Sequence, residues 1–286
     1  MKKILLSPIL FVLLALNTFA QDIQPVDTTK WLCTYNYDFL LDSTNSNSLR
    51  NDQMYLQIGS HLSKFTCALF FLQDSALYFT ELKNLDMATT INQVMKSTNG
   101  VRSSTLSMYR IYKNYPGKGL MSFTAFDDKH YKVDQPMKMK WKLVTQKDTV
   151  IFGYSCQMAR TSYAGRDWVA WYSPQIPVAD GPYKFNGLPG LILKISDTKN
   201  LHCFTLNAIK KVTYDQPILK STRISVDITA EEYIKAKRND LMRLYGDLQN
   251  GTITSNSEEA KARAMHGIFL KNNFIEKYKS IEKSTK

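Results

Sequence analysis

The chain lacks the short motifs that mark common catalytic and cofactor sites. It has no Gly-x-Ser-x-Gly elbow, no His-Glu-x-x-His pair, no glycine-rich phosphate loop before a helix and no calcium loop. Histidine is scarce, and no two of its residues stand at the spacing of metal ligands; they are His61, His130, His202 and His266. We therefore predict no metal, no cofactor and no catalytic residue recognisable from a motif. A hydrolase built from scattered residues is an alternative, and it requires a cleft with a histidine or carboxylate of perturbed pKa.

Cysteine is also sparse, and none of the four residues belongs to a Cys-x-x-Cys pair. This argues against a thioredoxin-like redox site and against a zinc knuckle. In an oxidising compartment an even number of cysteines favours disulfides, whose pairing the sequence does not determine. The alternative is that they are free thiols in the core. The candidates are Cys33, Cys67, Cys156 and Cys203.

Apolar runs long enough to cross a bilayer are absent after residue 20. Residues 1–20 begin with Lys2 and Lys3, continue with an apolar run over 4–16 and end on the small residue Ala20. This pattern is typical of a cleaved secretory signal, with an uncleaved anchor as the alternative. We expect an exported protein, periplasmic or extracellular, that is soluble after cleavage.

The charge is strongly basic, with 37 Lys and Arg against 25 Asp and Glu and a net charge of +12. A basic exported protein can bind anionic lipid headgroups, lipopolysaccharide or nucleic acid. The lysines are spread along the chain, which is typical of a solvated basic surface. We expect no nucleic-acid partner, and we keep envelope proteins, a lipid-like ligand and an anionic membrane surface as candidate partners.

The composition favours strands, since tyrosine (16) outnumbers glycine (12) and aromatics make up 12% of the chain. The predicted fold is mainly β, an antiparallel curved sheet or half-barrel with C-terminal helices, and α+β overall. Residues 79–100 have apolar side chains at roughly helical spacing. The predicted strands are 31–41, 54–58, 63–71, 109–112, 119–126, 138–144, 150–160, 166–173, 191–195 and 201–211.

The clearest predicted hairpin turns at Ala164-Gly165. On its return strand, large apolar side chains occupy both faces, which indicates a strand covered on both sides or one that lines a cavity. As an alternative to ligand binding, the aromatic side chains of this hairpin pack in the core, and Arg166 makes turn hydrogen bonds or ion pairs. The candidate ligand-binding residues are Tyr154, Arg166, Trp168, Trp171, Tyr172 and Tyr183.

Residues 181–190 hold three glycines and two prolines, and the apolar run 191–195 follows directly. Pro189-Gly190 predicts a type II turn, and Asn186-Gly187 is a second turn signal. We interpret the segment as a stiff corner between strands, with a ligand loop as the alternative. The residues of this structural motif are Gly181, Pro182, Gly187, Leu188, Pro189, Gly190, Leu191 and Ile192.

The pattern becomes helical after residue 228, so we divide the chain into a signal (1–20), a β-rich domain (21–228) and a helical segment (229–286). Thr229 and Glu232 form a capping box, and Gly246 is the predicted end of that helix. Ser255 and Glu258 form a second capping box. These helices either pack on the sheet or form an arm that docks a partner.

Residues 187–192, Gly-Leu-Pro-Gly-Leu-Ile, resemble the signature of the GLPGLI family of exported Bacteroidetes proteins. The segments 153–159, 165–172, 176–177 and 181–182 resemble further elements of that family, in its order. The run 273–276 is similar to its C-terminal Asn-Pro-Ile-Glu, with Phe274 in place of proline. The resemblance implies a secreted or periplasmic protein of unassigned activity, and it favours a structural disulfide at Cys156.

Together these features favour a binding or scaffold protein of the cell envelope over an enzyme. A concave sheet lined with aromatic residues would suit an apolar or lipid-like ligand, an expectation that rests on fold-level analogy. A module that docks onto an outer-membrane complex is the second hypothesis.

Overall fold

The computed structural model describes residues 23–104, 106–126 and 129–252, the positions 257, 261, 265 and 268, and residues 273–277. The predicted signal at 1–20 and the second capping box, Ser255 to Glu258, lie outside the described residues apart from position 257.

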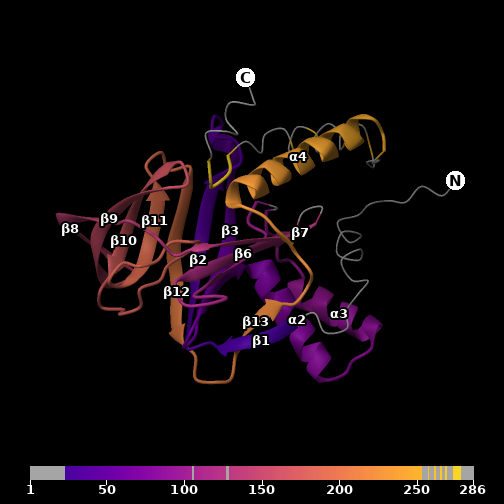
Figure 1. The fold of residues 1–286 in the computed structure, drawn as a ribbon, viewed down its shortest axis with the longest axis horizontal. Helices are drawn as coiled ribbons and strands as arrows, with labels where there is room; N and C mark the ends of the chain where they lie inside the picture. The colour runs from indigo at the N-terminus through magenta and orange to yellow at the C-terminus, as the bar shows by residue number, and fades with distance from the viewer. Residues whose placement is uncertain are drawn as a thin grey trace.

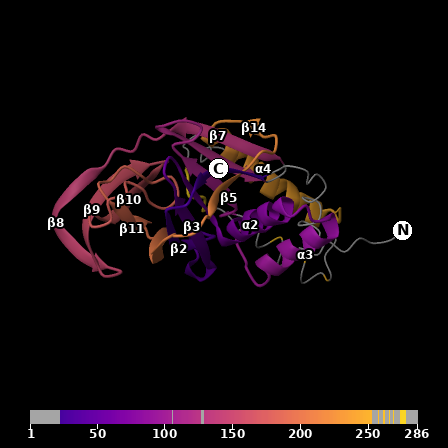
Figure 2. The same ribbon diagram turned by 90° about the horizontal axis from the view of Figure 1, so that it is seen from below.

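The centre of the molecule is one open, strongly curved sheet of twelve strands (Figures 1 and 2). Every neighbouring pair in it is antiparallel except the short β14–β7 pair, so the predicted antiparallel curved sheet is confirmed. A separate two-stranded sheet pairs β1 (Ile23–Thr28) with β13 (Pro217–Ser221). In spatial order the large sheet contains β14 (Val226–Asp227), β7 (His130–Pro136), β6 (Leu120–Phe126), β5 (Tyr109–Lys113), β4 (Ser63–Cys67), β3 (Leu49–Ile58), β2 (Trp31–Leu40), β12 (His202–Lys211), β11 (Leu191–Asp197), β10 (Arg166–Ser173), β9 (Tyr154–Tyr163) and β8 (Lys142–Ile151).

The curvature brings side chains from both arms of the sheet into one core on its inner face. Phe65 on β4 meets Phe204 on β12 with ring centroids 5.9 Å apart, and Tyr109 on β5 contacts Tyr183 at 5.5 Å. Edge-to-face aromatic pairs of this kind are favourable beyond their buried area. The high aromatic content of the sequence is therefore used mainly to fill the inside of the curve.

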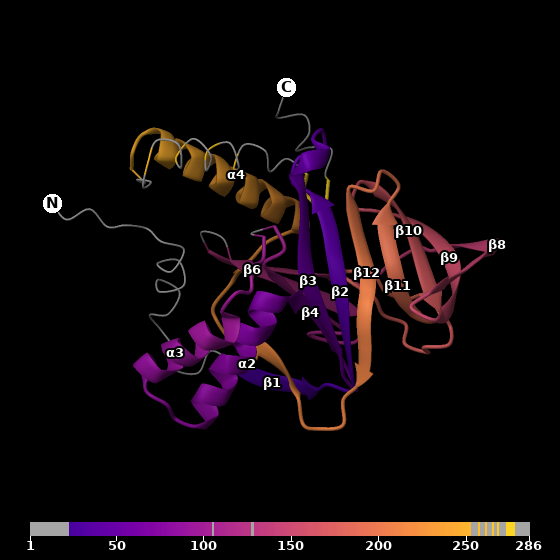
Figure 3. The same cartoon turned by 180° about the vertical axis from the view of Figure 1, so that it is seen from behind.

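A helical hairpin interrupts the strands where the sequence predicted a longer strand. The predicted strand 63–71 ends at Cys67, and α2 (Ala68–Leu82) begins at the next residue. Short apolar runs do not distinguish a buried strand from a buried helix, which explains the error. The helical spacing of apolar residues over 79–100 predicted a helix, and α3 (Met87–Thr98) lies within this range. Helix α2 packs beside β3 and β4 (Figure 3).

Two hairpins form the outermost arm of the sheet. The predicted turn at Ala164-Gly165 is confirmed, with φ of 48° and 76° at these residues, as a two-residue type I′ loop requires. The predicted single strand 150–160 is wrong, because a second turn at Phe152-Gly153, with φ of 53° and 79°, divides it between β8 and β9. An interior glycine in a strand pattern also marks a break, and here it marks a turn.

Helix α4 (Ala230–Gln249) begins at the predicted capping box. The Glu232 amide donates to Thr229 Oγ1 at 3.2 Å, and the Thr229 amide donates to Glu232 Oε2 at 2.8 Å. The helix continues past the predicted end at Gly246 to Gln249. Its first turns pack on the sheet through Tyr233, and its far end extends away from it (Figure 1). None of the described helices is both long and apolar enough to cross a membrane.

The expected disulfides are absent, because Cys33, Cys67, Cys156 and Cys203 are all free. Strand β3 separates β2, which carries Cys33, from β4, which carries Cys67, a gap of about 10 Å at the usual strand spacing. Two strands, β10 and β11, separate Cys156 from Cys203, a gap of about 14 Å. A disulfide requires Cα atoms within about 7 Å. The sheet register therefore excludes both pairings that the sequence order suggested.

Candidate functional site

The glycine- and proline-rich segment 181–190 lies inside the curve of the sheet. Its Tyr183, Phe185 and Leu188 are buried. Lys113 on β5 anchors the segment: its Nζ is paired with the carboxylate of Asp180 and donates to backbone oxygens within the segment. The motif is thus part of the core.

The turn inside this motif differs from the predicted type II turn. The Gly190 amide donates to the Leu188 carbonyl at 2.8 Å, which closes a three-residue turn centred on Pro189. Gly190 has a φ of +153°, and a Cβ placed on it would lie 2.2 Å from the backbone oxygen of Ser173. Glycine is required here because the end of β10 passes too close for any side chain.

The described C-terminal segment, residues 273–277, also lies on the inner face. Arg166 on β10 holds it: Nε donates to the Ile275 carbonyl at 3.0 Å, and Nη2 donates to Asn273 Oδ1 and the Phe274 carbonyl, both at 2.6 Å. Its Nη1 donates to Asp197 Oδ2 at 2.9 Å. A planar guanidinium with several fixed donors suits this task, since it orients backbone and carboxylate acceptors together.

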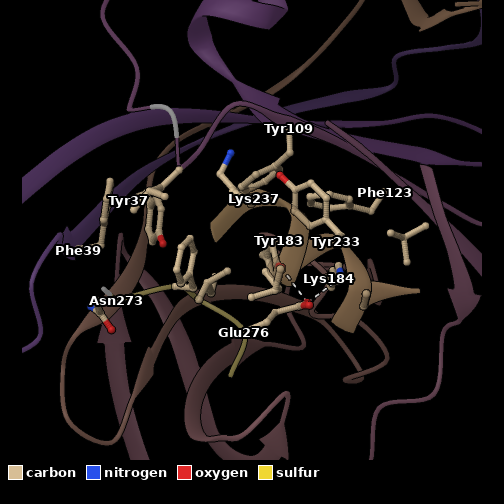
Figure 4. Close-up of a pocket in the computed structure, with 16 residues that line it drawn as sticks. Tyr37, Phe39, Tyr109, Phe123, Tyr183, Lys184, Tyr233, Lys237, Asn273 and Glu276 are labelled. Carbon is tan, nitrogen blue, oxygen red and sulfur yellow. Dashed lines mark hydrogen bonds and ion pairs between the residues drawn. The ribbon is translucent and has the colours of Figure 1, made fainter. Parts of the chain in front are cut away.

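A buried ion pair joins this C-terminal segment to the motif (Figure 4). Lys184 Nζ lies 2.7 Å from Glu276 Oε1, and the two side chains are 2% and 3% exposed. The same oxygen accepts from the Tyr183 hydroxyl at 2.8 Å. The lysine ammonium also lies 4.9 Å from the centre of the Phe123 ring, a favourable cation–π distance.

These groups surround a small cavity of about 30 Å³ between the sheet, α4 and the C-terminal segment (Figure 4). The hydroxyl of Tyr109, one of its lining residues, has no hydrogen-bond partner among the residues that the structure describes. An aromatic wall with a few polar groups is typical of sites for small ligands. The labelled lining residues are Tyr37, Phe39, Tyr109, Phe123, Tyr183, Lys184, Tyr233, Lys237, Asn273 and Glu276.

The phenols in the cavity are hydrogen-bonding groups and not acids at neutral pH. Burial raises the pKa of Tyr37, Tyr109 and Tyr183 well above the ordinary value of 10.0. Within the described part of the chain, no group of three or more His, Cys, Asp or Glu side chains is arranged to hold a metal ion. As it stands, the cavity therefore suits a water-sized group that makes one or two hydrogen bonds to these phenols.

The structure disperses most of the predicted ligand-binding residues. Only Tyr183 lines the cavity. Trp168 and Tyr172 are buried on one face of β10, and Trp168 packs on Phe185 at 4.7 Å. Trp171 lies on the opposite face, where it pairs with Met158. By the alternation of β9, Tyr154 shares that opposite face, while Arg166 anchors the C-terminal segment.

The histidines do not form a cluster among the described residues. His61 is exposed, His130 is on β7 in one arm, and His202 is buried on β12. Burial, with the nearby charge of Arg166, lowers the pKa of His202 well below 6.5. Its Nδ1 lies 2.8 Å from the Tyr37 hydroxyl. His266 lies outside the described residues.

The sequence did not identify Lys184 and Glu276 as partners. They are 92 positions apart, and no local pattern relates them. Glu276 falls in the segment 273–276 quoted for the family resemblance, whereas Lys184 lies between the quoted segments 181–182 and 187–192.

The fold and the cavity define a curved-sheet protein whose inner face is closed by its own loop and C-terminal segment. Residues 157–194 match the model of a Bacteroidetes-associated family described as a protein of unknown function (Porph_ging). This match runs from β9 through the motif into β11 and covers less than half of the chain. A comparison with curated proteins finds no match.

Among solved structures, the chain is similar to two crystal forms of PNGF-II, with 14% and 15% sequence identity and TM-scores of 0.45 and 0.46. The similarity covers 74% of this chain, and 34% and 33% of the PNGF-II chains. The chain therefore spans about a third of the length of these relatives. Similarity at this level does not establish a shared activity.

Proposed function

We propose that the chain is an exported, GLPGLI-type binding protein of the cell envelope that holds an apolar, lipid-like ligand on the inner face of its curved sheet. The aromatic cavity beneath the C-terminal segment is the observation that carries this proposal. The signal-like pattern of residues 1–20 and the motif at 187–192 support the export and family parts of it.

The cavity as it stands, about 30 Å³, has room for water-sized groups and not for an acyl chain. A larger ligand therefore has to displace Phe274 and Ile275, which are half-buried in the cavity wall. Only two backbone hydrogen bonds tie the described segment down, from Asn273 to Leu41 and from Lys277 to Ala164. Its other contacts come from side chains, among them Arg166 and the buried Lys184–Glu276 pair, so its release breaks no strand ladder but separates that ion pair.

Titration with a fluorescent fatty acid tests the proposal in the full mature protein. Ala230 lines the cavity at the start of α4, so Ala230→Leu fills the space and should weaken binding by about tenfold or more. Ala208→Leu, an equal change at an exposed position of β12, is the matched control and should bind like the parent. Absence of saturable binding by the parent, or equal affinity of the two variants, would contradict the proposal.

A partner-binding module and a hydrolase stay as predictions. Crosslinking in whole cells followed by mass spectrometry would test the first. The second needs a histidine or carboxylate of perturbed pKa in a cleft. His202 has a lowered pKa but does not line the aromatic cavity. Asp74 lines a second cavity and also has a lowered pKa, but its carboxylate is held in ion pairs with Lys64 and Arg110.

A further inference from the structure

A second cavity, of about 90 Å³, lies on the outer face of the sheet, where α2 packs beside β1 and β13 (Figure 1). Its floor is a row of side chains from three neighbouring strands. Arg110 on β5 is directly opposite Thr124 on β6, which is opposite Lys132 on β7. Residues directly opposite each other share a face, so this row points away from the aromatic core to which Tyr109 and Phe123 belong.

The carboxylate at this cavity is already neutralised from two sides. Arg110 donates to Asp74 through Nε at 2.8 Å and Nη2 at 2.5 Å, and Lys64 Nζ donates to it at 2.8 Å. Burial opposes ionisation of Asp74, but the two cations outweigh it and lower its pKa to about 2. Burial also lowers the pKa of Lys64 from its ordinary 10.5, although the neighbouring Asp74 carboxylate opposes that shift.

Further cations surround the same space. Lys132 lies 3.0 Å from Asp227 and 3.4 Å from Asp134. Lys220 and Arg223 also line the cavity, and Lys220 Nζ donates to the Ser221 carbonyl at 3.2 Å and lies 5.5 Å from the centre of the Tyr115 ring. Among the described residues that line this cavity are four lysines and arginines and one carboxylate, Asp74. The hydroxyls of Thr124, Ser221 and Ser225 add neutral donors to the lining.

The arrangement suits a compact anion with several acceptor oxygens. The guanidinium of Arg110 uses Nε and Nη2 on Asp74, and its side chain is 15% exposed, so its Nη1 edge remains for a ligand. Held rigidly by Asp74, this edge needs little ordering when an anion arrives. The cavity has room for several water molecules, which a tetrahedral oxyanion would replace.

We propose that this outer-face cavity, between α2, the β5–β7 strands and residues 220–225, binds the phosphate group of a small molecule or a lipid headgroup. Arg110 and Lys220 contact the phosphate oxygens, and the serine and threonine hydroxyls complete the site. The site is separate from the aromatic cavity, so the proposal of phosphate binding is tested independently of the proposal of apolar-ligand binding.

Calorimetric titration of the mature protein with inorganic phosphate at low ionic strength tests this site. The paired variant Lys220→Gln with Arg223→Gln should weaken binding by about tenfold, because two charges near the anion are lost. The matched control, Lys210→Gln with Lys211→Gln, removes the same charge from exposed positions of β12 and should change affinity by less than about twofold. Circular dichroism establishes that both variants are folded. Equal losses of phosphate affinity in the two paired variants would mean a general charge effect and would overturn the proposal. Absence of phosphate binding by the parent protein would overturn it as well.

Two further arms identify the source of the phosphate. Glycerol phosphate represents a soluble ligand, and vesicles of phosphatidic acid in phosphatidylcholine represent a lipid headgroup. Binding of glycerol phosphate that is weakened in the Lys220/Arg223 pair supports a soluble ligand. Vesicle binding that inorganic phosphate competes away supports a headgroup. Vesicle binding that phosphate does not compete for, without binding of either soluble phosphate, would overturn the proposed site.

Discussion

Loss of the Glu276 charge is the sharpest test of how the inner face is closed. Glu276→Gln keeps an oxygen to accept from the Tyr183 hydroxyl, but it removes the negative charge 2.7 Å from Lys184 Nζ. The lysine side chain is 2% exposed, so bulk solvent does not reach it after the carboxylate charge is lost. Breaking one side of a buried ion pair costs about 3–5 kcal/mol of unfolding free energy. The cation–π contact with Phe123, at 4.9 Å, was already present and offsets none of this loss.

The expected loss, about 3–4 kcal/mol, can be measured by urea unfolding at pH 7 with circular dichroism as the signal. The double variant Lys184→Met with Glu276→Gln removes both charges and should recover about 2 kcal/mol or more relative to Glu276→Gln alone. Asp227→Asn is the control, because Asp227 pairs with Lys132 at 73% side-chain exposure and should cost about 1 kcal/mol or less. A Glu276→Gln protein as stable as the parent, or a double variant no better than the single one, would refute the account of the buried pair.

Three further outcomes are expected from the rest of the molecule. Gly190→Ala should lower the unfolding free energy by about 3 kcal/mol or more, because the new Cβ would lie 2.2 Å from a backbone oxygen. A Cβ at Gly187 would meet no atom within 4 Å, so Gly187→Ala should cost only about 1–2 kcal/mol in denaturant unfolding. Similar losses in the two variants would mean that the close approach of the backbone is not the reason for glycine at 190. The pKa of His202 is lowered in the folded state, so as the pH falls the imidazole becomes protonated first in the unfolded chain. The free energy of unfolding should therefore decrease below pH 6.5, by at most about 1.4 kcal/mol per pH unit. The variant His202→Gln should lose this part of the pH dependence in thermal melts recorded at different pH values. Alkylation without reductant, read out by mass spectrometry, should label all four cysteines in the denatured protein. In the folded protein it should label mainly the half-buried Cys203, because burial raises the pKa of the other three thiols. A pair of cysteines left unlabelled after denaturation would show a disulfide.

Much of the architecture follows from local sequence. The capping box at Thr229, the turn at Ala164-Gly165 and the alternation along residues 166–173 each depend on neighbours within a few positions. Local backbone preferences and the two-residue period of a strand are sufficient to predict such features. The same reasoning failed at Phe152-Gly153 and at Cys67, where the local pattern was compatible with two structures.

The candidate site depended on long-range pairing. Sequence reasoning already put Trp168 and Trp171 on opposite faces of the strand, as the alternation of β10 has them, but it listed both as ligand-binding residues and neither lines the cavity. The cavity instead combines residues from β2, β5, β6, the motif, α4 and the C-terminal segment. No spacing in the sequence relates these segments, because the curvature of the sheet brings them together.

The sequence by itself determined the strand-rich class, the position of α4 and the need for glycine in the motif. Only the tertiary structure decided that Lys184 and Glu276 form a buried pair, that Arg110 and Lys132 share a face, and that the cysteines stay apart. The physical reason is the same in each case. Backbone propensity acts over a few residues, whereas burial, ion pairing and disulfide geometry depend on distances that strand register and sheet curvature set.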